Sequence, residues 1–104
     1  MTAFPIPSSF WLFGQKITIE WIDMLVENED ATGLSLYRKN VIQIQKPNIG
    51  ISRPQVQIEC TFLHELMHYI FFMLSKDDLR KDEVLVDTIA KLLHQAFTTA
   101  EYKE

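Results

Sequence analysis

The stretch CTFLHELMHYIFFML at residues 60–74 is mostly apolar and contains neither proline nor glycine. Its apolar side chains would point to nearly all sides of a helix, so we predict a helix over about 54–74 that packs on more than one face. The same stretch carries two imidazoles and a carboxylate, at His64, His68 and Glu65. Such groups are costly to bury unless hydrogen bonds or a metal ion satisfy them. We therefore expect this helix to carry a functional site as well as part of the core.

The chain ahead of this helix predicts a small β-sheet. Residues 9–23, SFWLFGQKITIEWID, alternate apolar and polar side chains on both sides of Gly14, which indicates two strands joined by a turn or bulge. The segments GLSLY (33–37) and VIQIQ (41–45) flank RKN, and their alternation predicts a hairpin whose turn places Asn40 at a positive φ. We expect these segments to form one twisted sheet of three to four strands.

The remaining segments predict two irregular connections and a second helix. ENEDATG at 27–33 has no periodicity, and KPNIGISRPQ at 46–55 contains prolines and a glycine, so both are expected to be irregular. Residues 75–82, SKDDLRKD, end the long helix and supply N-caps for a final helix over 78–99 or 82–99. The predicted apolar stripe of that helix consists of Val84, Leu85, Ile89, Leu92, Leu93 and Phe97.

The fold class that follows is α+β: a small N-terminal sheet, then a buried helix that carries the site, then a C-terminal helix. With 104 residues and 47% hydrophobic side chains, the chain has the size and apolar content of one domain, residues 1–104. Its net charge is −4 and its basic residues are scattered, which disfavours nucleic acid as a partner. No window reaches the roughly 18 apolar residues of a membrane span. Because there is no signal-peptide pattern and only one cysteine, Cys60, we expect a soluble cytoplasmic protein.

His64 and His68 have the spacing of two ligands for one metal ion. Positions i and i+4 lie one turn apart on the same face of a helix, so both imidazoles can reach one divalent cation, and zinc is the ion we expect. Glu65 is offset from His64 by about 100° around the helix axis, so it borders the ion rather than binding it. A carboxylate in that place can take a proton from an activated water and return it to a leaving amine. The alternative interpretation is that both histidines are core or surface residues with separate hydrogen-bond partners.

A catalytic zinc site needs a third protein ligand, and the final helix offers two candidates. Glu83 and Asp87, in the segment EVLVD, are spaced i and i+4 and share a face. We expect Glu83, which has the longer side chain, to bind the metal and Asp87 to orient a histidine through its second ring nitrogen. The spacing also allows the reverse assignment. Both acids could instead be solvated groups that the helix dipole favours near an N-terminus.

Four further side chains are candidates for the site. Cys60 lies about 12 Å along the helix from His68, too far to share one metal ion, so we expect a buried thiol. His94, on the final helix, could approach the site as an oxyanion stabiliser or a ligand, or else remain a surface or core-edge histidine. Tyr37 and Tyr69 could donate to a tetrahedral intermediate, but the sequence selects neither.

HELMH at 64–68, followed fifteen residues later by EVLVD, resembles the gluzincin pattern HExxH…ExxxD. With its strands ahead of the helix, the chain is similar to short zincin-like metallopeptidases of phages and prophages, which are related in outline to ImmA/IrrE-type peptidases and minimal gluzincins. The resemblance implies a minimal zincin-like fold in which His64, His68 and Glu83 bind zinc. It also implies that Glu65 is the general base and that Asp87 orients a ligand.

From these patterns we expect a zinc-dependent metallopeptidase that hydrolyses peptide bonds in an extended polypeptide. The peptide or protein substrate is expected to bind as an added strand along an edge of the sheet, beside 33–37 or 41–45. The main alternative is a zinc-stabilised, non-catalytic binding or regulatory module of a phage type. Glu65 argues against it, because a structural site has no use for an acid there and closes its fourth position with protein. A third alternative is a pseudo-enzyme that has these residues but lacks a substrate cleft.

Overall fold

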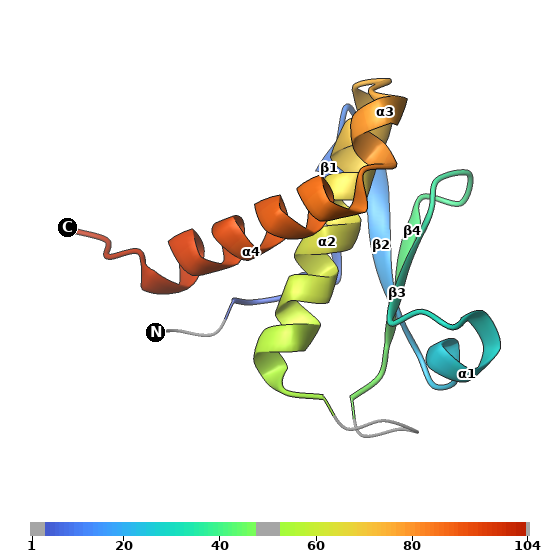
Figure 1. Ribbon diagram of the computed structural model, residues 1–104, viewed down its shortest axis with the longest axis horizontal. Helices are drawn as coiled ribbons and strands as arrows, with labels where there is room; N and C mark the ends of the chain where they lie inside the picture. The colour runs from blue at the N-terminus through green and yellow to red at the C-terminus, as the bar shows by residue number, and fades with distance from the viewer. Residues whose placement is uncertain (1–3, 48–52, 104) are drawn as a thin grey trace.

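The computed structural model describes residues 4–47 and 53–103. A four-stranded sheet forms one layer, and the long helices lie on one side of it (Figure 1). In chain order the elements are β1 (Ser9–Leu12), β2 (Gln15–Ile22), α1 (Leu25–Glu29), β3 (Gly33–Leu36), β4 (Val41–Gln45), α2 (Gln55–Met73), α3 (Asp77–Arg80) and α4 (Glu83–Thr99). An N-terminal sheet followed by helices confirms the predicted α+β fold class.

The strands of the sheet follow the order β1-β2-β4-β3, so β1 and β3 are its two edges. β1 and β2 form an antiparallel hairpin in which Phe13 and Gly14 turn the chain with φ values of 48° and 75°. β3 and β4 form a second antiparallel hairpin, and Asn40 in its turn has the predicted positive φ, at 55°. The two hairpins join through parallel pairing of β2 with β4. Of the two strands that we considered for substrate pairing, β4 is therefore interior and β3 is at an edge.

α2 lies between the sheet and α4 (Figure 1). Ile17 and Ile19 of β2 and Ile42 and Ile44 of β4 are buried on one face of the sheet, where they pack against apolar residues of α2. The core cluster on this side consists of Ile17, Ile19, Ile42, Ile44, Ile58, Phe62, Leu63, Tyr69 and Ala90. A second cluster joins α2 to α4 through Met67, Phe71 and Val86. This burial on two sides is the reason why the α2 sequence is apolar nearly all around.

The connection between β2 and β3 contains a short helix. The predicted loop over 27–33 is wrong at its start, because α1 occupies Leu25–Glu29. Two contacts with the rest of the fold hold this helix: the side chain of Leu25 is buried, and the backbone amide of Val26 donates to Oε1 of Gln45 at 2.9 Å. Because Gln45 belongs to β4, the local sequence of the acidic segment does not reveal this anchor.

The boundaries of the two long helices lie close to the predicted ones. α2 begins at Gln55 after the N-cap Pro54 and ends before Leu74. α4 begins after Asp82, whose Oδ1 accepts a hydrogen bond from the backbone amide of Leu85 at 3.0 Å. The predicted irregular segment 46–55 lies partly outside the described residues. No helix in the described part of the chain is long and apolar enough to cross a membrane.

The predicted apolar stripe of α4 is only partly correct. Three of its members are exposed, namely Val84, Leu92 and Phe97. The buried residues of the helix are instead Val86, Ala90, His94 and Thr98. His94 can enter the interface because it pairs there with Glu59 of α2, and Ala90 is small enough to allow close packing of the helices. The sequence of α4 alone does not show that a histidine has a buried partner on another helix.

Candidate metal centre

His64 and His68 lie on the side of α2 that faces the beginning of α4. They are one helical turn apart, and their Nε2 atoms are 3.1 Å from each other. Both side chains are partly buried. The two ring nitrogens therefore meet at the surface of the protein, where solvent or a ligand can reach them.

Glu83 is the first residue of α4, and the N-cap at Asp82 fixes where that helix begins. Its Oε2 lies 3.1 Å from Nε2 of His64, and its Oε1 lies 3.3 Å from Nε2 of His68. The side chain of Glu83 is 67% exposed. Its carboxylate thus completes a group of three potential ligands on an open side of the molecule.

The separations between the potential ligand atoms are compatible with a tetrahedral zinc ion, and each Glu83 oxygen lies next to one histidine nitrogen. Zinc binds nitrogen and oxygen at about 2.0–2.1 Å, so its ligands lie roughly 3.3 Å from one another. The observed separations in this cluster are 3.1–3.3 Å. The two Nε2 atoms carry at most two N–H groups, so without a cation at least one of the three close contacts has no hydrogen of its own, whereas one zinc ion would satisfy all three groups. Over residues 4–47 and 53–103, this is the one cluster of three or more such side chains that fits a metal ion.

Asp87 lies on the opposite side of the His64 ring from the ligand atoms. Its Oδ1 is 3.5 Å from Nδ1 of His64, and its Oδ2 is 2.8 Å from Nζ of Lys91. The hydrogen bond from Lys91 lowers the pKa of Asp87 below its usual value, so the carboxylate stays charged. A carboxylate next to Nδ1 favours the tautomer of His64 whose lone pair is on Nε2. The structure thus places Glu83 beside both ligand nitrogens and Asp87 beside the other nitrogen of one ring.

Glu65 points from α2 toward β3, where Ser35 holds it. The Ser35 hydroxyl lies 2.8 Å from Oε1 of Glu65 and 3.1 Å from the backbone oxygen of the same residue. Burial raises the pKa of Glu65 above its usual value, although the Ser35 hydrogen bond and the charges of His68 and His64 oppose this. A bound dication would act in the same direction as the histidines. Sequence reasoning missed Ser35 altogether.

One face of the β3 segment borders the cluster. Gly33, Ser35 and Tyr37 occupy alternate positions and so share this face. A Cβ atom at Gly33 would lie 2.7 Å from Cγ2 of Thr61 and 3.0 Å from Cγ of Glu65, so only glycine allows the strand to approach α2 this closely. The small, hydroxyl and aromatic residues at alternate positions of GLSLY are the signal in the sequence for this face. The prediction of a hairpin used only the leucines of that alternation.

The structure distinguishes the two candidate tyrosines. Tyr69 is fully buried, and its hydroxyl donates to the backbone oxygen of Leu36 at 2.9 Å, so it belongs to the core. Tyr37 is packed below Arg80, whose guanidinium carbon lies 5.5 Å from the ring centroid. Burial raises the pKa of Tyr37, so its hydroxyl remains a donor at neutral pH. It lines a cavity of about 410 Å³ that also borders His64, Glu65 and His68.

The two remaining candidates differ from the expectations. His94 does not approach the metal ligands: it is buried, with Nε2 2.7 Å from Oε1 of Glu59. Burial alone would raise the pKa of Glu59, but hydrogen bonding by His94, Gln55 and the backbone of Phe4 lowers it below the usual value. Cys60 is only partly buried, and burial raises the pKa of its thiol. Its sulfur is therefore a poor metal ligand at neutral pH.

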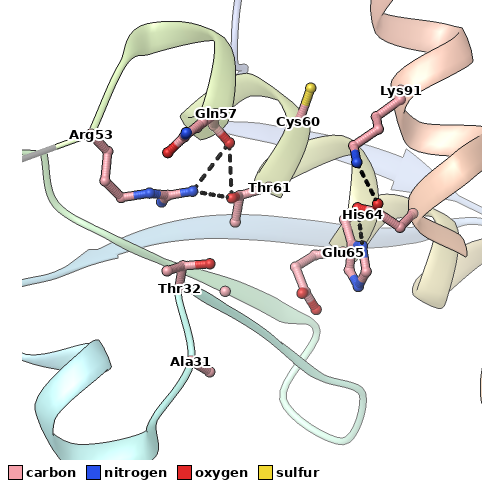
Figure 2. A pocket seen from close by; sticks show the side chains of 11 residues that line it. Ala31, Thr32, Arg53, Gln57, Cys60, Thr61, His64, Glu65 and Lys91 are labelled. Atoms are coloured by element: carbon pink, nitrogen blue, oxygen red, sulfur yellow. Dashed lines mark hydrogen bonds and ion pairs between the residues drawn. The ribbon is translucent and has the colours of Figure 1, made fainter. Parts of the chain in front are cut away.

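A second cavity, of about 400 Å³, lies next to Glu65 (Figure 2). It is bounded by the segment before β3, by α2, by α4 and by Arg53. Gly33, His64 and Glu65 line both cavities. The candidate metal centre therefore lies where two hollows meet beside the edge strand.

Comparisons with known protein families, curated proteins and solved structures find no match to this chain. The resemblance to zincin-like metallopeptidases stays a prediction from the sequence motif. Function is accordingly inferred from the geometry of the side chains described above.

Proposed function

We propose that the chain is a zinc-dependent metallopeptidase that hydrolyses peptide bonds in an extended polypeptide. The observation that carries the proposal is a buried carboxylate, Glu65, fixed beside the ligand cluster of His64, His68 and Glu83 without being part of it. A zinc ion held by these ligands would act as a Lewis acid and would lower the pKa of water to near neutrality. A lone cysteine in a partly buried place, Cys60, fits a reducing compartment such as the cytoplasm.

In this proposal Glu65 is the general base. It accepts a proton from the attacking water and donates it to the nitrogen of the leaving amine. A pKa raised by burial supports both steps, because a group whose pKa is nearer to neutral can take up a proton and give it back. Ser35 holds Oε1, whereas Oε2 lies toward Gly33 and the cavities. One carboxylate oxygen is thus fixed while the other faces the space that a substrate would occupy.

The edge strand β3 is the proposed docking place for the substrate backbone. A peptide that pairs with an edge strand is held by main-chain hydrogen bonds, which do not depend on its side chains. Gly33 of β3 borders both cavities, so a paired peptide would cross the ligand cluster. The hydroxyl of Tyr37, on the same side of the chain, is the proposed donor to the oxyanion of the tetrahedral intermediate.

A zinc-stabilised, non-catalytic module is the second candidate function. Such a site normally closes the fourth coordination position with protein. In the described part of the chain the cluster contains three potential ligands, and its glutamate is 67% exposed. This open side favours catalysis over a purely structural role.

The variant Glu65→Gln tests the proposal. The amide keeps the size and the contact with Ser35 but accepts no proton, so peptide hydrolysis should fall by about 10²–10⁴-fold. Zinc content, measured by elemental analysis, and melting temperature should stay as in the wild type. Glu20→Gln, which changes an exposed glutamate of β2, is the matched control.

Two outcomes would contradict the proposed function. In the first, Glu65→Gln cleaves peptides as fast as the wild type, which would show that another group is the base. In the second, the wild-type protein binds one zinc ion per chain but cleaves no member of an unbiased peptide library. That result would favour the non-catalytic module.

A further inference from the structure

The cavity beside Glu65 contains a guanidinium group, that of Arg53, for which residues 4–47 and 53–103 provide no carboxylate partner. Nη2 of Arg53 donates to Oγ1 of Thr61 at 2.5 Å and to the backbone oxygen of Gln57 at 3.2 Å. Nη1 of Arg53 is buried and has no hydrogen-bond partner in the described part of the chain. Burial lowers the pKa of Arg53 below its usual value. The segment NIGIS at 48–52, just ahead of it, contains no acidic residue.

A partly buried guanidinium group with an unpaired nitrogen is suited to bind an anion. A partly buried charge is unfavourable until a counter-ion joins it, and the planar guanidinium binds a carboxylate through two parallel hydrogen bonds. Figure 2 shows Arg53 and Lys91 on opposite sides of the cavity. The charge of Lys91 is already matched by Asp87, at 2.8 Å. Among the described residues that line the cavity, Arg53 is therefore the cation without a matching acid.

The residue that Arg53 contacts, Thr61, lies about one helical turn from the proposed general base. Thr61, which Arg53 contacts, precedes Glu65 by four residues on the same face of α2. This spacing corresponds to about 6 Å along the helix axis. An extended peptide advances roughly 3.3 Å per residue, so the guanidinium is within reach of a group one or two residues from the cleaved bond.

We propose that Arg53 binds a carboxylate of the substrate and thereby selects peptides that carry a negative charge one or two residues from the cleaved bond. This inference rests on the proposed peptidase function and adds the class of substrate. The carboxylate can belong to an acidic side chain or to the C-terminus of the peptide, because both present the same two oxygens. A cavity of about 400 Å³ has room for either.

Matched peptides test the inference. They carry Glu or Gln at each of the two positions on either side of the bond, and each is made with a free and with an amidated C-terminus. We expect kcat/KM of the zinc-loaded protein to be about 10–100-fold higher for the peptide with the recognised carboxylate. If amidated peptides still show the preference for Glu, the recognised carboxylate is that of the side chain. If the preference requires a free C-terminus, the recognised carboxylate is the terminal one. Arg53→Gln should bring the ratio close to one.

The controls separate charge, folding and catalysis. Arg38→Gln removes the same charge from an exposed site in the β3–β4 turn and should leave the preference unchanged. Should Arg53→Gln fail to fold, Arg53→Lys keeps the charge without the fork and should reduce the preference by several-fold. Calorimetric binding of the same peptides to zinc-loaded Glu65→Gln protein gives a readout that does not depend on hydrolysis.

The outcomes are distinguishable. If the protein cleaves nothing yet binds the carboxylate peptide more tightly through Arg53, the peptidase proposal fails and the anion site stands. If carboxylate and neutral peptides bind equally well and are cleaved equally fast, the anion site is overturned while the peptidase proposal stands. A preference that survives both substitutions of Arg53 would also overturn it.

Discussion

α2 and α4 cross at an angle (Figure 1), and a histidine–carboxylate contact lies at each end of their interface with the roles exchanged. At one end His64 and His68 of α2 meet Glu83 of α4, and at the other end Glu59 of α2 meets His94 of α4. The side chain of Glu83 is 67% exposed, whereas those of His94 and Glu59 are 6% and 2% exposed. The same two functional groups thus form an open cluster at one end and a closed pair at the other.

Burial is the difference that separates the two ends. In the closed pair the surroundings strengthen the hydrogen bond, and removal of one partner strands a charge away from water. In the open cluster the solvent weakens the contacts between the groups, so without an ion they contribute little to stability. Substitutions at the two ends should therefore damage different properties: metal binding at one and folding at the other.

Loss of a ligand at the open end should have the largest effect. His68→Ala leaves two ligand groups where a catalytic zinc site needs three, so the zinc content should fall from about one per chain to near zero and hydrolysis should vanish. The metal-free wild type and the variant should melt at similar temperatures. Elemental analysis and calorimetry with and without chelator make the comparison. Retention of one zinc ion by the variant would refute the ligand assignment.

Loss of the histidine at the closed end should unfold the protein instead. His94→Ala leaves Glu59 buried without its partner, which should lower the free energy of unfolding by roughly 3–5 kcal/mol. The folded fraction at low temperature should still bind one zinc ion. Denaturant unfolding measures the first effect, and elemental analysis measures the second.

A double variant sharpens this result. Glu59→Leu combined with His94→Leu replaces the pair with apolar groups and should be clearly more stable than His94→Ala, because no charge is stranded. If His94→Ala lowers the free energy of unfolding by less than about 1 kcal/mol, the closed pair does not stabilise the fold as expected.

An intermediate loss of zinc affinity is expected when Asp87, next to Nδ1 of His64, is changed. Asp87→Asn removes the charge next to Nδ1 of His64 and should cost about 10–100-fold in zinc affinity or activity, with stoichiometry intact at saturating zinc. Glu83→Ala should weaken zinc binding far more. Competition with a chromogenic chelator gives both affinities. Equal losses of zinc affinity in Asp87→Asn and Glu83→Ala would contradict the separate roles proposed for these two acids.

The smallest expected effect is a loss of folding stability at acidic pH. Because the pKa of Glu59 is lower in the folded protein than its ordinary value near 4.5, its contribution to stability is complete above that value. It disappears as the pH falls through the folded-state pKa. Urea unfolding of metal-free protein should therefore show that the wild type loses stability relative to the double variant, in which both members of the pair are leucine, below about pH 4.5. If the difference in the free energy of unfolding between the wild type and the double variant stays constant down to about pH 3, Glu59 does not make this contribution.

Features with a local signal were predictable from the sequence. Alternation around Gly14 and around Asn40 predicted both hairpins, and the apolar run around HELMH predicted α2 and its burial on two sides. The spacing of His64 and His68 placed two ligand atoms together because helix geometry alone determines it. Glu83 was a candidate because it is spaced i and i+4 with Asp87 and has the longer side chain, and its carboxylate lies beside both histidines.

Features that depend on partners distant in sequence were not predictable. Ser35 reaches Glu65 across 30 positions, and His94 reaches Glu59 across 35, so no local pattern connects them. That second contact buries His94, a residue that the predicted apolar stripe of α4 did not include. Parallel pairing of β2 with β4 likewise depends on how the two hairpins meet. Such contacts become evident only when the elements are assembled.

The histidine lies on α2 at one end of the interface and on α4 at the other, and this arrangement also restricts the alignment of α4 along α2. A shift by one turn, about 6 Å, would bring Ala90 or Thr98 opposite Glu59 and would carry Glu83 away from the histidines. The stranded carboxylate would penalise that alignment, much as one polar residue fixes the alignment of a coiled coil. The buried pair of Glu59 and His94, which lies outside the candidate metal cluster, thus favours the one alignment of α4 that brings Glu83 next to His64 and His68.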